Sequence, residues 1–294
     1  MDHQLFTARA KQLGADVTLQ VTSCADAAKG IREGSLRVQG IDALVLVSSN
    51  DGHALEVVEA AHGAGVPVVA YDKLIEDCEL DLFVSFDNLK VGILQASYLT
   101  KRVPHGKYVL IGGPPEDANA KSYRLGQMAI LQPFLDRGDI QIVADEAAKG
   151  WFPMEAFRIT KAALEKTGGK IDAVLASNDG TAGGALQALT GKGLAGKVPV
   201  TGQDADLAAC RRIVQGIQSM TVYKPVTLLA ARAAEATVAL CMKEPFPGKI
   251  QVIPNGNRSV PSLLYEPITV DLDNLRATVI KDGFHVEAEV FVAP

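Results

Sequence analysis

Short runs of apolar residues alternate with amphipathic segments along most of this chain. The runs at 43–47, 66–70 and 108–111 are rich in Val, Ile and Leu, with no regular alternation of polar residues. The segments between them, such as 55–64 and 91–101, have apolar residues at helical spacing. Continuous apolar strands separated by such helices indicate parallel sheets that are covered on both faces. The pattern therefore predicts a doubly wound α/β protein.

The same alternation of predicted strands and helices continues to residue 242. Further strands are predicted at 17–21, 83–86, 140–144, 173–176, 198–201 and 220–222, and further helices at 5–13, 123–136, 153–166, 182–190, 207–215 and 226–242. A length of 294 residues suits two domains of ordinary size better than one. Because no Pro-rich or low-complexity linker interrupts the pattern, short hinge strands are expected to join them.

One motif occurs twice, at 42–72 and at 172–204. In each copy an apolar run is followed by Ser-Asn-Asp-Gly, a helix, a Val-Pro-Val strand and an aspartate. Two similar α/β lobes explain this repeat. It puts four polar residues at the carboxyl ends of strands, where open parallel sheets bind ligands: Asn50, Asp72, Asn178 and Asp204. These residues either serve as turn and capping residues or converge on a neutral polyol, whose hydroxyls both donate and accept.

Composition and short motifs exclude several classes of function. The formal net charge is −5 and the pI about 5.6, which argues against a nucleic-acid partner because phosphates need a basic surface. No apolar stretch approaches the roughly 20 residues that span a bilayer. The four cysteines are far apart and lack metal-ligand spacing, so neither a metal site nor a cofactor is expected. No P-loop, GxSxG, HExxH or dinucleotide fingerprint appears.

Several long motifs resemble the periplasmic xylose-binding proteins. They include Phe83-Val-Ser-Phe-Asp-Asn88, the stretch from Gly112 to Lys121, the block from Ile171 to Leu207, Met220-Thr-Val-Tyr-Lys-Pro225, and Val279-Ile-Lys-Asp-Gly-Phe-His285. The resemblance runs from about residue 5 to the end of the chain. It implies a type I periplasmic binding protein: two Rossmann-like lobes with parallel sheets, joined by three hinge crossings, with a pyranose held between them.

The resemblance also implies the residues that contact the sugar: Asp117, Asn119, Trp151, Asn178, Asp204 and Lys224, with Arg124 in a matching motif. Trp151, the only tryptophan, would stack on the C–H face of the ring. The two aspartates would accept from pairs of hydroxyls by charge-assisted bonds. Lys224 would donate to a sugar oxygen and neutralise the carboxylates.

Two features depart from the family pattern. The family has an arginine after the Tyr-Asp pair that contacts sugar, whereas Tyr71-Asp72 is followed here by Lys73, a compact charge without a bidentate fork. The chain also begins inside the family's first helix, so the first strand of lobe one is missing from it. The expected division is 1–103 plus 225–258 for the N-terminal lobe and 104–224 plus 259–294 for the C-terminal lobe.

The function that the resemblance implies is the substrate-binding component of a sugar ABC importer, which closes on a pentose such as D-xylose by hinge motion. It would work in the periplasm with a membrane permease as partner, although no signal peptide is evident. Two alternatives share the fold: a sugar receptor that signals to a sensor kinase or chemoreceptor, and the effector domain of a LacI-type repressor. In an enzyme alternative, Asp117 and Asp204 would act as a glycosidase pair.

Overall fold

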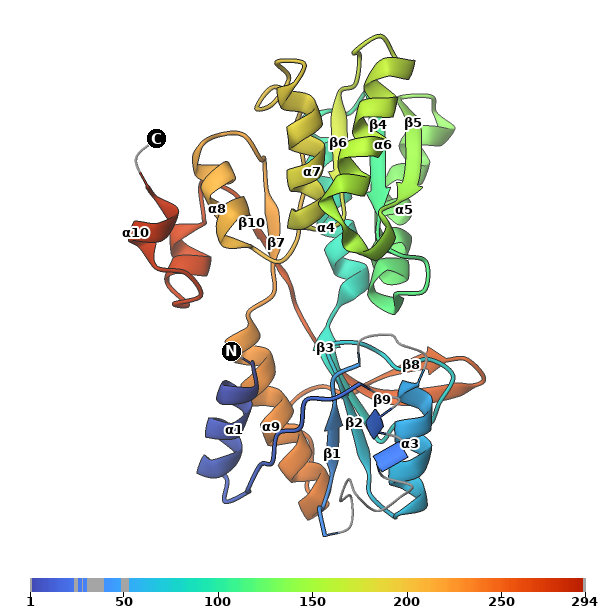
Figure 1. The fold of residues 1–294 in the computed structure, drawn as a ribbon, viewed down its shortest axis with the longest axis vertical. Helices are drawn as coiled ribbons and strands as arrows, with labels where there is room; N and C mark the ends of the chain where they lie inside the picture. Colours follow the sequence, from blue (N-terminus) through green and yellow to red (C-terminus); the bar gives the residue numbers. More distant parts are fainter. Residues whose placement is uncertain (1, 24–25, 28, 31–39, 49–52, 293–294) are drawn as a thin grey trace. The chain divides into compact units, whose positions relative to one another are not determined.

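The computed structural model describes residues 2–23, 26–27, 29–30, 40–48 and 53–292, which form two compact units (Figure 1). Unit 1 comprises Met1–Phe86 and Val226–Tyr265, and unit 2 comprises Asp87–Pro225 and Glu266–Pro294. The chain therefore passes from one unit to the other three times. The predicted α/β class with mainly parallel sheets is confirmed.

Unit 1 is built on one five-stranded sheet. In spatial order its strands are β1 (Leu44–Leu46), β2 (Val68–Tyr71), β3 (Leu82–Phe86), β9 (Arg258–Tyr265) and β8 (Gln251–Asn255). All neighbours are parallel except β8, which pairs with β9 antiparallel. Among the described residues, β1 forms one edge of this sheet.

Helices cover both faces of the sheet in unit 1 (Figure 1). Helices α1 (Asp2–Gln12) and α9 (Val226–Met242) lie on one face, and α3 (Ala54–Gly63) lies on the other. Val69 and Val84 pack toward α9, whereas Val68 and Phe83 pack toward α3. Because successive residues of each strand enter two different cores, the strands read as continuous apolar runs.

Unit 2 has a central parallel sheet in the order β5 (Ile140–Ala147), β4 (Gly106–Gly112) and β6 (Ala173–Ala176). A parallel bridge from Val174 to Val200 continues this sheet. The segment around Val200 is in turn hydrogen-bonded to β7 (Thr221–Tyr223), and β7 pairs antiparallel with β10 (Ile268–Val270).

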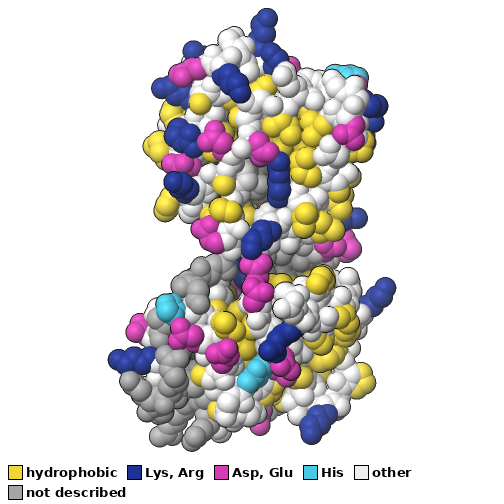
Figure 2. Space-filling model, turned by 90° about the vertical axis from the view of Figure 1, so that its right-hand side faces the viewer, with side chains coloured by type: hydrophobic (Ala, Val, Ile, Leu, Met, Phe, Trp, Pro, Cys, Tyr) yellow, Lys and Arg dark blue, Asp and Glu magenta, His cyan; other side chains and the backbone are white. Residues whose placement is uncertain are grey.

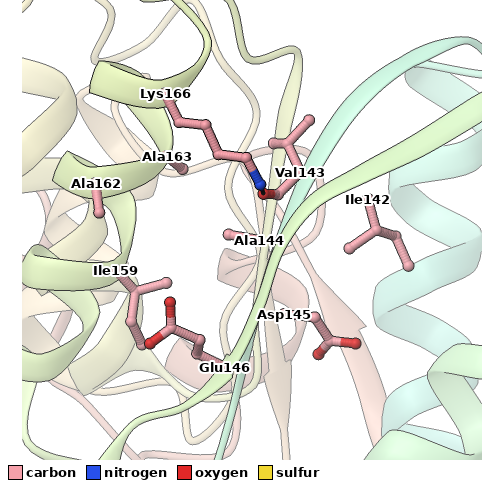
Figure 3. A pocket seen from close by; sticks show the side chains of 9 residues that line it. All are labelled: Ile142, Val143, Ala144, Asp145, Glu146, Ile159, Ala162, Ala163 and Lys166. Carbon is pink, nitrogen blue, oxygen red and sulfur yellow. Dashed lines mark hydrogen bonds between the residues drawn. The ribbon is translucent and has the colours of Figure 1, made fainter.

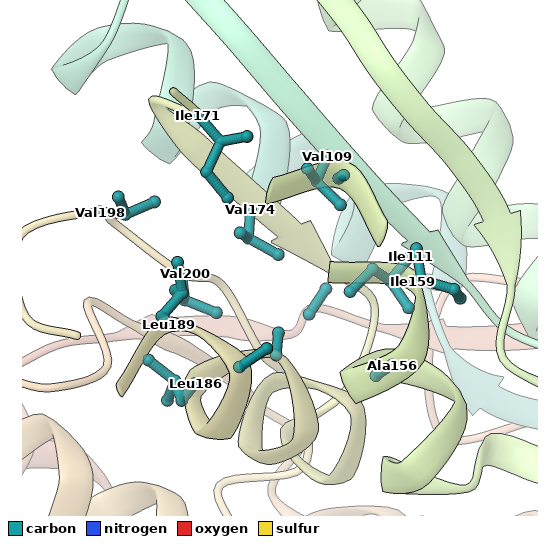
Figure 4. Close-up of a cluster of buried hydrophobic side chains, with 14 of the residues drawn as sticks. Val109, Ile111, Ala156, Ile159, Ile171, Val174, Leu186, Leu189, Val198 and Val200 are labelled. Atoms are coloured by element: carbon teal, nitrogen blue, oxygen red, sulfur yellow. The ribbon is translucent and has the colours of Figure 1, made fainter. Parts of the chain in front are cut away.

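Two helix pairs enclose the central sheet of unit 2. Helices α6 (Pro153–Lys166) and α7 (Asp179–Thr190) pack on a core that includes Val109, Ile111 and Val174 (Figure 4). Helices α4 (Asn88–Arg102) and α5 (Ala118–Asp136) cover the other face, on Leu110 and Leu175. The remaining elements are a 3₁₀ turn at Lys149–Trp151, α8 (Leu207–Val214), a π turn at Arg276–Ile280 and α10 (Glu287–Val290).

The unit boundaries differ from those that the sequence predicted, since residues 87–103 lie in unit 2 and residues 259–265 in unit 1. The backbones of α4 and α5 come so close that a Cβ at Gly92 would lie 2.0 Å from the carbonyl oxygen of Tyr123. A Cβ at Gly126 would meet the Leu89 carbonyl at the same distance. This contact ties α4 to unit 2, while the pairing of β9 with β3 up to Tyr265 keeps all of β9 in unit 1.

Two predicted strands are not formed as expected. Residues 17–21 have no regular secondary structure, and Leu19 and Val21 are 54% and 91% exposed. A strand needs a hydrogen-bonded neighbour, and no described residue pairs with this segment as a strand. At 198–201 only Val200 forms a bridge. The first Ser-Asn-Asp-Gly copy, at 49–52, lies outside the described residues.

Candidate functional site

Seven of the eight predicted site residues belong to unit 2, while Lys73 belongs to unit 1. Six of the seven follow strands, at the carboxyl ends where open α/β sheets bind ligands. Asp117 and Asn119 follow β4, Trp151 follows β5, Asn178 follows β6, Asp204 follows the segment around Val200, and Lys224 follows β7.

Asp117 and Trp151 are joined directly. Asp117 is 4% exposed and caps α5: its Oδ1 accepts from the Asn119 and Ala120 amides at 2.9 and 3.3 Å. Its Oδ2 accepts from Trp151 Nε1 at 3.2 Å. The indole lies against Gly113, where a Cβ would approach the ring to 2.1 Å. The glycine therefore allows the indole to lie on the backbone beyond β4, and the carboxylate sets the orientation of the ring.

Lys224 is held by Tyr123, a residue that the sequence analysis missed. The Lys224 ammonium lies 2.9 Å from the Tyr123 hydroxyl and 5.2 Å from the centroid of its ring. Tyr123 also meets Trp151 edge to face, with centroids 6.4 Å apart. The lysine is only 9% exposed, so its charge lies inside the protein rather than in solvent. Tyr123 comes four residues after Asn119 on α5, and that spacing was the available signal.

Asn119 is oriented by a second missed residue, Asn88. Asn88 is the first residue of α4, and its Nδ2 donates to Asn119 Oδ1 at 2.8 Å. Both side chains are buried. Because the Asn119 oxygen accepts this bond, its amide nitrogen is the group that it would offer as a donor. Asn88 follows the end of β3, and this position at a strand end was the signal in the sequence.

Asn178 combines the two roles that the sequence left open. Its Oδ1 accepts from the Thr181 amide at 2.9 Å and from the Thr181 hydroxyl at 2.7 Å, which makes it the cap of α7. The amide nitrogen takes no part in this capping. Asn178 is therefore a capping residue that keeps a donor at the carboxyl end of β6.

Asp204 sits in an unusual backbone conformation. Its φ is 106°, and the next residue, Ala205, has a φ of 54°. Positive φ is uncommon outside glycine and marks positions that the surrounding structure holds in place. In the other copy of the repeat, Asp72 also has a positive φ, of 63°. The two copies thus share a positive φ at the aspartate as well as the sequence pattern.

A layer of buried amides lies beneath the strand ends of unit 2. Gln95 donates to the carbonyls of Ser177 and Gly202, each at 3.0 Å. Gln127 donates to Gln95 Oε1 at 2.9 Å and to the Ser177 hydroxyl at 3.1 Å. These bonds tie α4 and α5 to the segments that carry Asn178 and Asp204, so the backbone beneath both residues is rigidly supported.

The structure does not bring Arg124 into this group. Its guanidinium pairs with Asp145 on β5. Asp145 lines a hollow of about 330 Å³ between β5 and α6, shown in Figure 3. Glu146, on the other side of β5 in that view, pairs with Arg158 at 2.8 Å. The charged side chains of the hollow thus have partners of their own, and none of the predicted site residues lines it.

Three further properties of the described residues bear on the site: surface charge, possible metal ligands and apolar helices. On the face shown in Figure 2, basic and acidic side chains are interspersed rather than gathered into one field. Within the described ranges, no three His, Cys, Asp or Glu residues are placed to hold a metal ion. Among the helices of that part of the chain, none is long and apolar enough to span a membrane.

Comparisons with known proteins identify relatives of this chain. The chain is 46% identical to the D-xylose-binding periplasmic protein of Escherichia coli (strain K12) over 289 residues, which cover 98% of this chain and 87% of that protein. The protein of the same name from Haemophilus influenzae is 44% identical over 290 residues, with 99% and 87% covered.

Two solved structures of solute binding proteins resemble this chain over nearly its whole length. An ABC transporter solute binding protein from Clostridium phytofermentans with bound β-D-glucose has a TM-score of 0.84 and 29% identity, covering 98% of this chain and 94% of its own. The carbohydrate transporter solute binding protein of Chloroflexus aurantiacus in complex with D-glucose has a TM-score of 0.85 and 28% identity, with 98% and 93% covered. The periplasmic binding protein domain family matches residues 2–245. This chain therefore belongs to the family of periplasmic binding proteins.

Proposed function

We propose that this chain is the substrate-binding component of a sugar ABC importer and binds D-xylose without changing it chemically. The observation that carries the proposal is the grouping of Asp117, Asn119, Trp151 and Lys224 at the carboxyl end of the sheet in unit 2. The 46% and 44% identities to D-xylose-binding periplasmic proteins support the choice of sugar.

The chemistry of these groups suits a neutral polyol. Carboxylates at Asp117 and Asp204 accept from hydroxyls, while the amides of Asn119 and Asn178 and the Lys224 ammonium donate to sugar oxygens. The indole of Trp151 offers a flat apolar face for the C–H groups of the ring. A site with a few convergent polar groups beside an aromatic face is typical of small-molecule binding.

Lys73 enters this proposal through the predicted hinge mechanism. It follows Asp72, at the positive-φ turn of unit 1. A ligand with partners in both units binds the closed form better than the open form, and so shifts the population toward closure. Hinge closure and the role of Lys73 both remain predictions.

Calorimetric titration of the purified chain with D-xylose is the direct test. We expect saturable binding with a stoichiometry of one, accompanied by a change in Trp151 fluorescence, since this indole is the only one in the chain. D-Glucose and D-ribose serve as the comparison sugars, and an aryl xyloside tests for hydrolysis. A folded protein that binds none of these sugars would contradict the proposal, and turnover of the aryl xyloside would favour an enzyme.

Tyr123→Phe tests the support of Lys224. The change removes the hydroxyl bonded to the ammonium and keeps the ring beneath it. We expect D-xylose affinity to fall about threefold to tenfold, because the hydroxyl acts on the sugar only through Lys224 and a hydrogen bond contributes a net ~1 kcal/mol. Tyr98→Phe is the matched control, since the Tyr98 hydroxyl bonds to Ser219 O and Asp271 instead. Equal effects of the two variants would contradict a specific role for Tyr123.

The partner and compartment are part of the proposal. We propose a membrane permease of the ABC importer class as partner and the periplasm as the site of action, as in the relatives named D-xylose-binding periplasmic proteins. Stimulation of a reconstituted xylose importer's ATPase by the sugar-loaded chain would support this partner. Sugar binding without such stimulation would point instead to a receptor that signals to a sensor kinase or chemoreceptor.

A further inference from the structure

A buried carboxyl group lies behind Asp204 and takes no part in the proposed sugar contacts. Asp179 is the first residue of α7 and is 1% exposed. Its Oδ1 accepts from Gln218 Nε2 at 2.7 Å. Its Oδ2 accepts from the Asp206 amide at 2.9 Å and from the Thr221 hydroxyl at 2.9 Å. Three donors therefore converge on one carboxyl group, which is more than capping a helix requires.

Two of these donors hold the turn that presents Asp204. The Asp206 amide follows directly after the two positive-φ residues, Asp204 and Ala205. The Thr221 hydroxyl that bonds to Asp179 also accepts from the Ala205 amide at 3.2 Å. On the other side, His285 Nε2 lies 2.7 Å from the Ala205 carbonyl oxygen. A strained turn persists only where its surroundings hold it, and Asp179 provides two of these anchors, one of them through Thr221.

We propose that Asp179 is a positioning residue for sugar binding, which holds the 204–206 turn so that the Asp204 carboxylate meets the ligand. This role rests on the proposed function, because Asp204 matters here only as a sugar contact. Asp179 itself is too deeply buried to touch a ligand. Arg212 supports the arrangement by donating to the Asp179 carbonyl at 3.0 Å and to Gln218 Oε1 at 2.9 Å.

The charges around Asp179 make this role depend on pH. Burial and, after it, the nearby charge of Asp204 raise the pKa of Asp179 to about 8, although the bonds from Gln218 and the Asp206 amide act in the opposite direction. The other titratable and charged groups that face the site are Asp206, Cys210, Arg212 and, beside Asp206, His285.

The three hydrogen-bond donors around Asp179 determine whether D-xylose affinity rises or falls with pH. An ionised carboxylate only accepts, so it can satisfy all three donors, whereas a protonated group turns one oxygen into a donor. The turn is therefore best anchored when Asp179 is ionised, which is favoured above pH 8. We expect D-xylose affinity to rise severalfold between pH 7 and pH 9, with a midpoint near 8.

Asp179→Asn tests the proposal. The amide keeps the shape of the side chain, but its NH₂ group would face hydrogen-bond donors that the carboxylate accepts from. We expect at least a tenfold loss of D-xylose affinity at pH 8 and a flat affinity profile between pH 7 and pH 9. In the sugar-free protein, the Ala205 and Asp206 amides should exchange with solvent at least tenfold faster. Asp172→Asn is the matched control: this carboxylate accepts from the Lys107 amide at 2.7 Å, at the opposite end of the sheet in the same unit.

The outcomes separate the two proposals. An Asp179→Asn protein that binds D-xylose within twofold of wild type, with the wild-type pH profile, would overturn the positioning role and leave the proposed function standing. A folded wild type that binds no sugar would remove the proposed function and the role of Asp179 with it. If Asp179→Asn does not fold, Thr221→Val, which removes the bridging hydroxyl, is expected to give the same loss of affinity and faster Ala205 exchange.

Discussion

Asp204→Asn is expected to weaken D-xylose binding about 100-fold while leaving the fold intact. The substitution keeps the shape of the side chain, and asparagine tolerates the positive φ of this position. It removes the negative charge that would accept from two hydroxyls. Charge-assisted bonds contribute roughly 1.5–3 kcal/mol each, and a net loss of about 3 kcal/mol corresponds to a factor of roughly 100. Calorimetric titration at pH 8 measures the loss directly.

The control for this experiment is Asp136→Asn, which removes an exposed carboxylate at the end of α5 that bonds only locally, to Gln132 at 2.7 Å. It should bind D-xylose as the wild type does. Gln203 Nε2 also donates to Asp204 Oδ1, so a thermal melt of the sugar-free variant is needed to separate turn stability from ligand contact. An Asp204→Asn protein with wild-type affinity would exclude this carboxylate from the sugar site.

Lys224→Met is expected to reduce affinity by a similar factor, for a different reason. The ammonium is nearly buried and bonds to the Tyr123 hydroxyl within the group that contains Asp117 and Trp151. Methionine keeps much of the length of the side chain and removes the charge. The loss of a charged hydrogen-bond donor to the sugar corresponds to roughly 1.5–3 kcal/mol, or a factor of about 10 to 150 in affinity.

Lys224→Arg sharpens the interpretation, since it keeps the charge but spreads it over a larger planar group. We expect it to retain more affinity than Lys224→Met. Lys170→Met serves as the control, because Lys170 is exposed between α6 and β6, at the amino end of the strand. If both Lys224 variants bound D-xylose like the wild type, the charge would have no role in recognition.

Much of the candidate site followed from local sequence. The repeated strand, Asn-Asp-Gly, helix and aspartate pattern located Asn178 and Asp204 at strand ends, and the positive φ at both Asp72 and Asp204 shows that the repeat extends to backbone geometry. Arg124 is different: its motif predicted a sugar contact, but its guanidinium pairs with Asp145 on β5. A sequence motif identifies a position on a helix but does not determine which neighbouring strand offers a partner.

The class of fold and the order of its elements could be inferred from the residue pattern, because strands buried on both faces must be continuously apolar and parallel strands need helical crossovers. The contacts between particular side chains depend on how the elements pack together. The bonds of Asn88 to Asn119, Tyr123 to Lys224, and Asp179 to Asp206 and Thr221 join residues from different elements. The placement of α4 in unit 2 depended on the close approach at Gly92 and Gly126. Residues 17–21 form no strand, since within the described part of the chain no strand pairs with them. The periodicity of apolar residues indicates which side chains are buried. It does not indicate which residue of another element each buried side chain contacts.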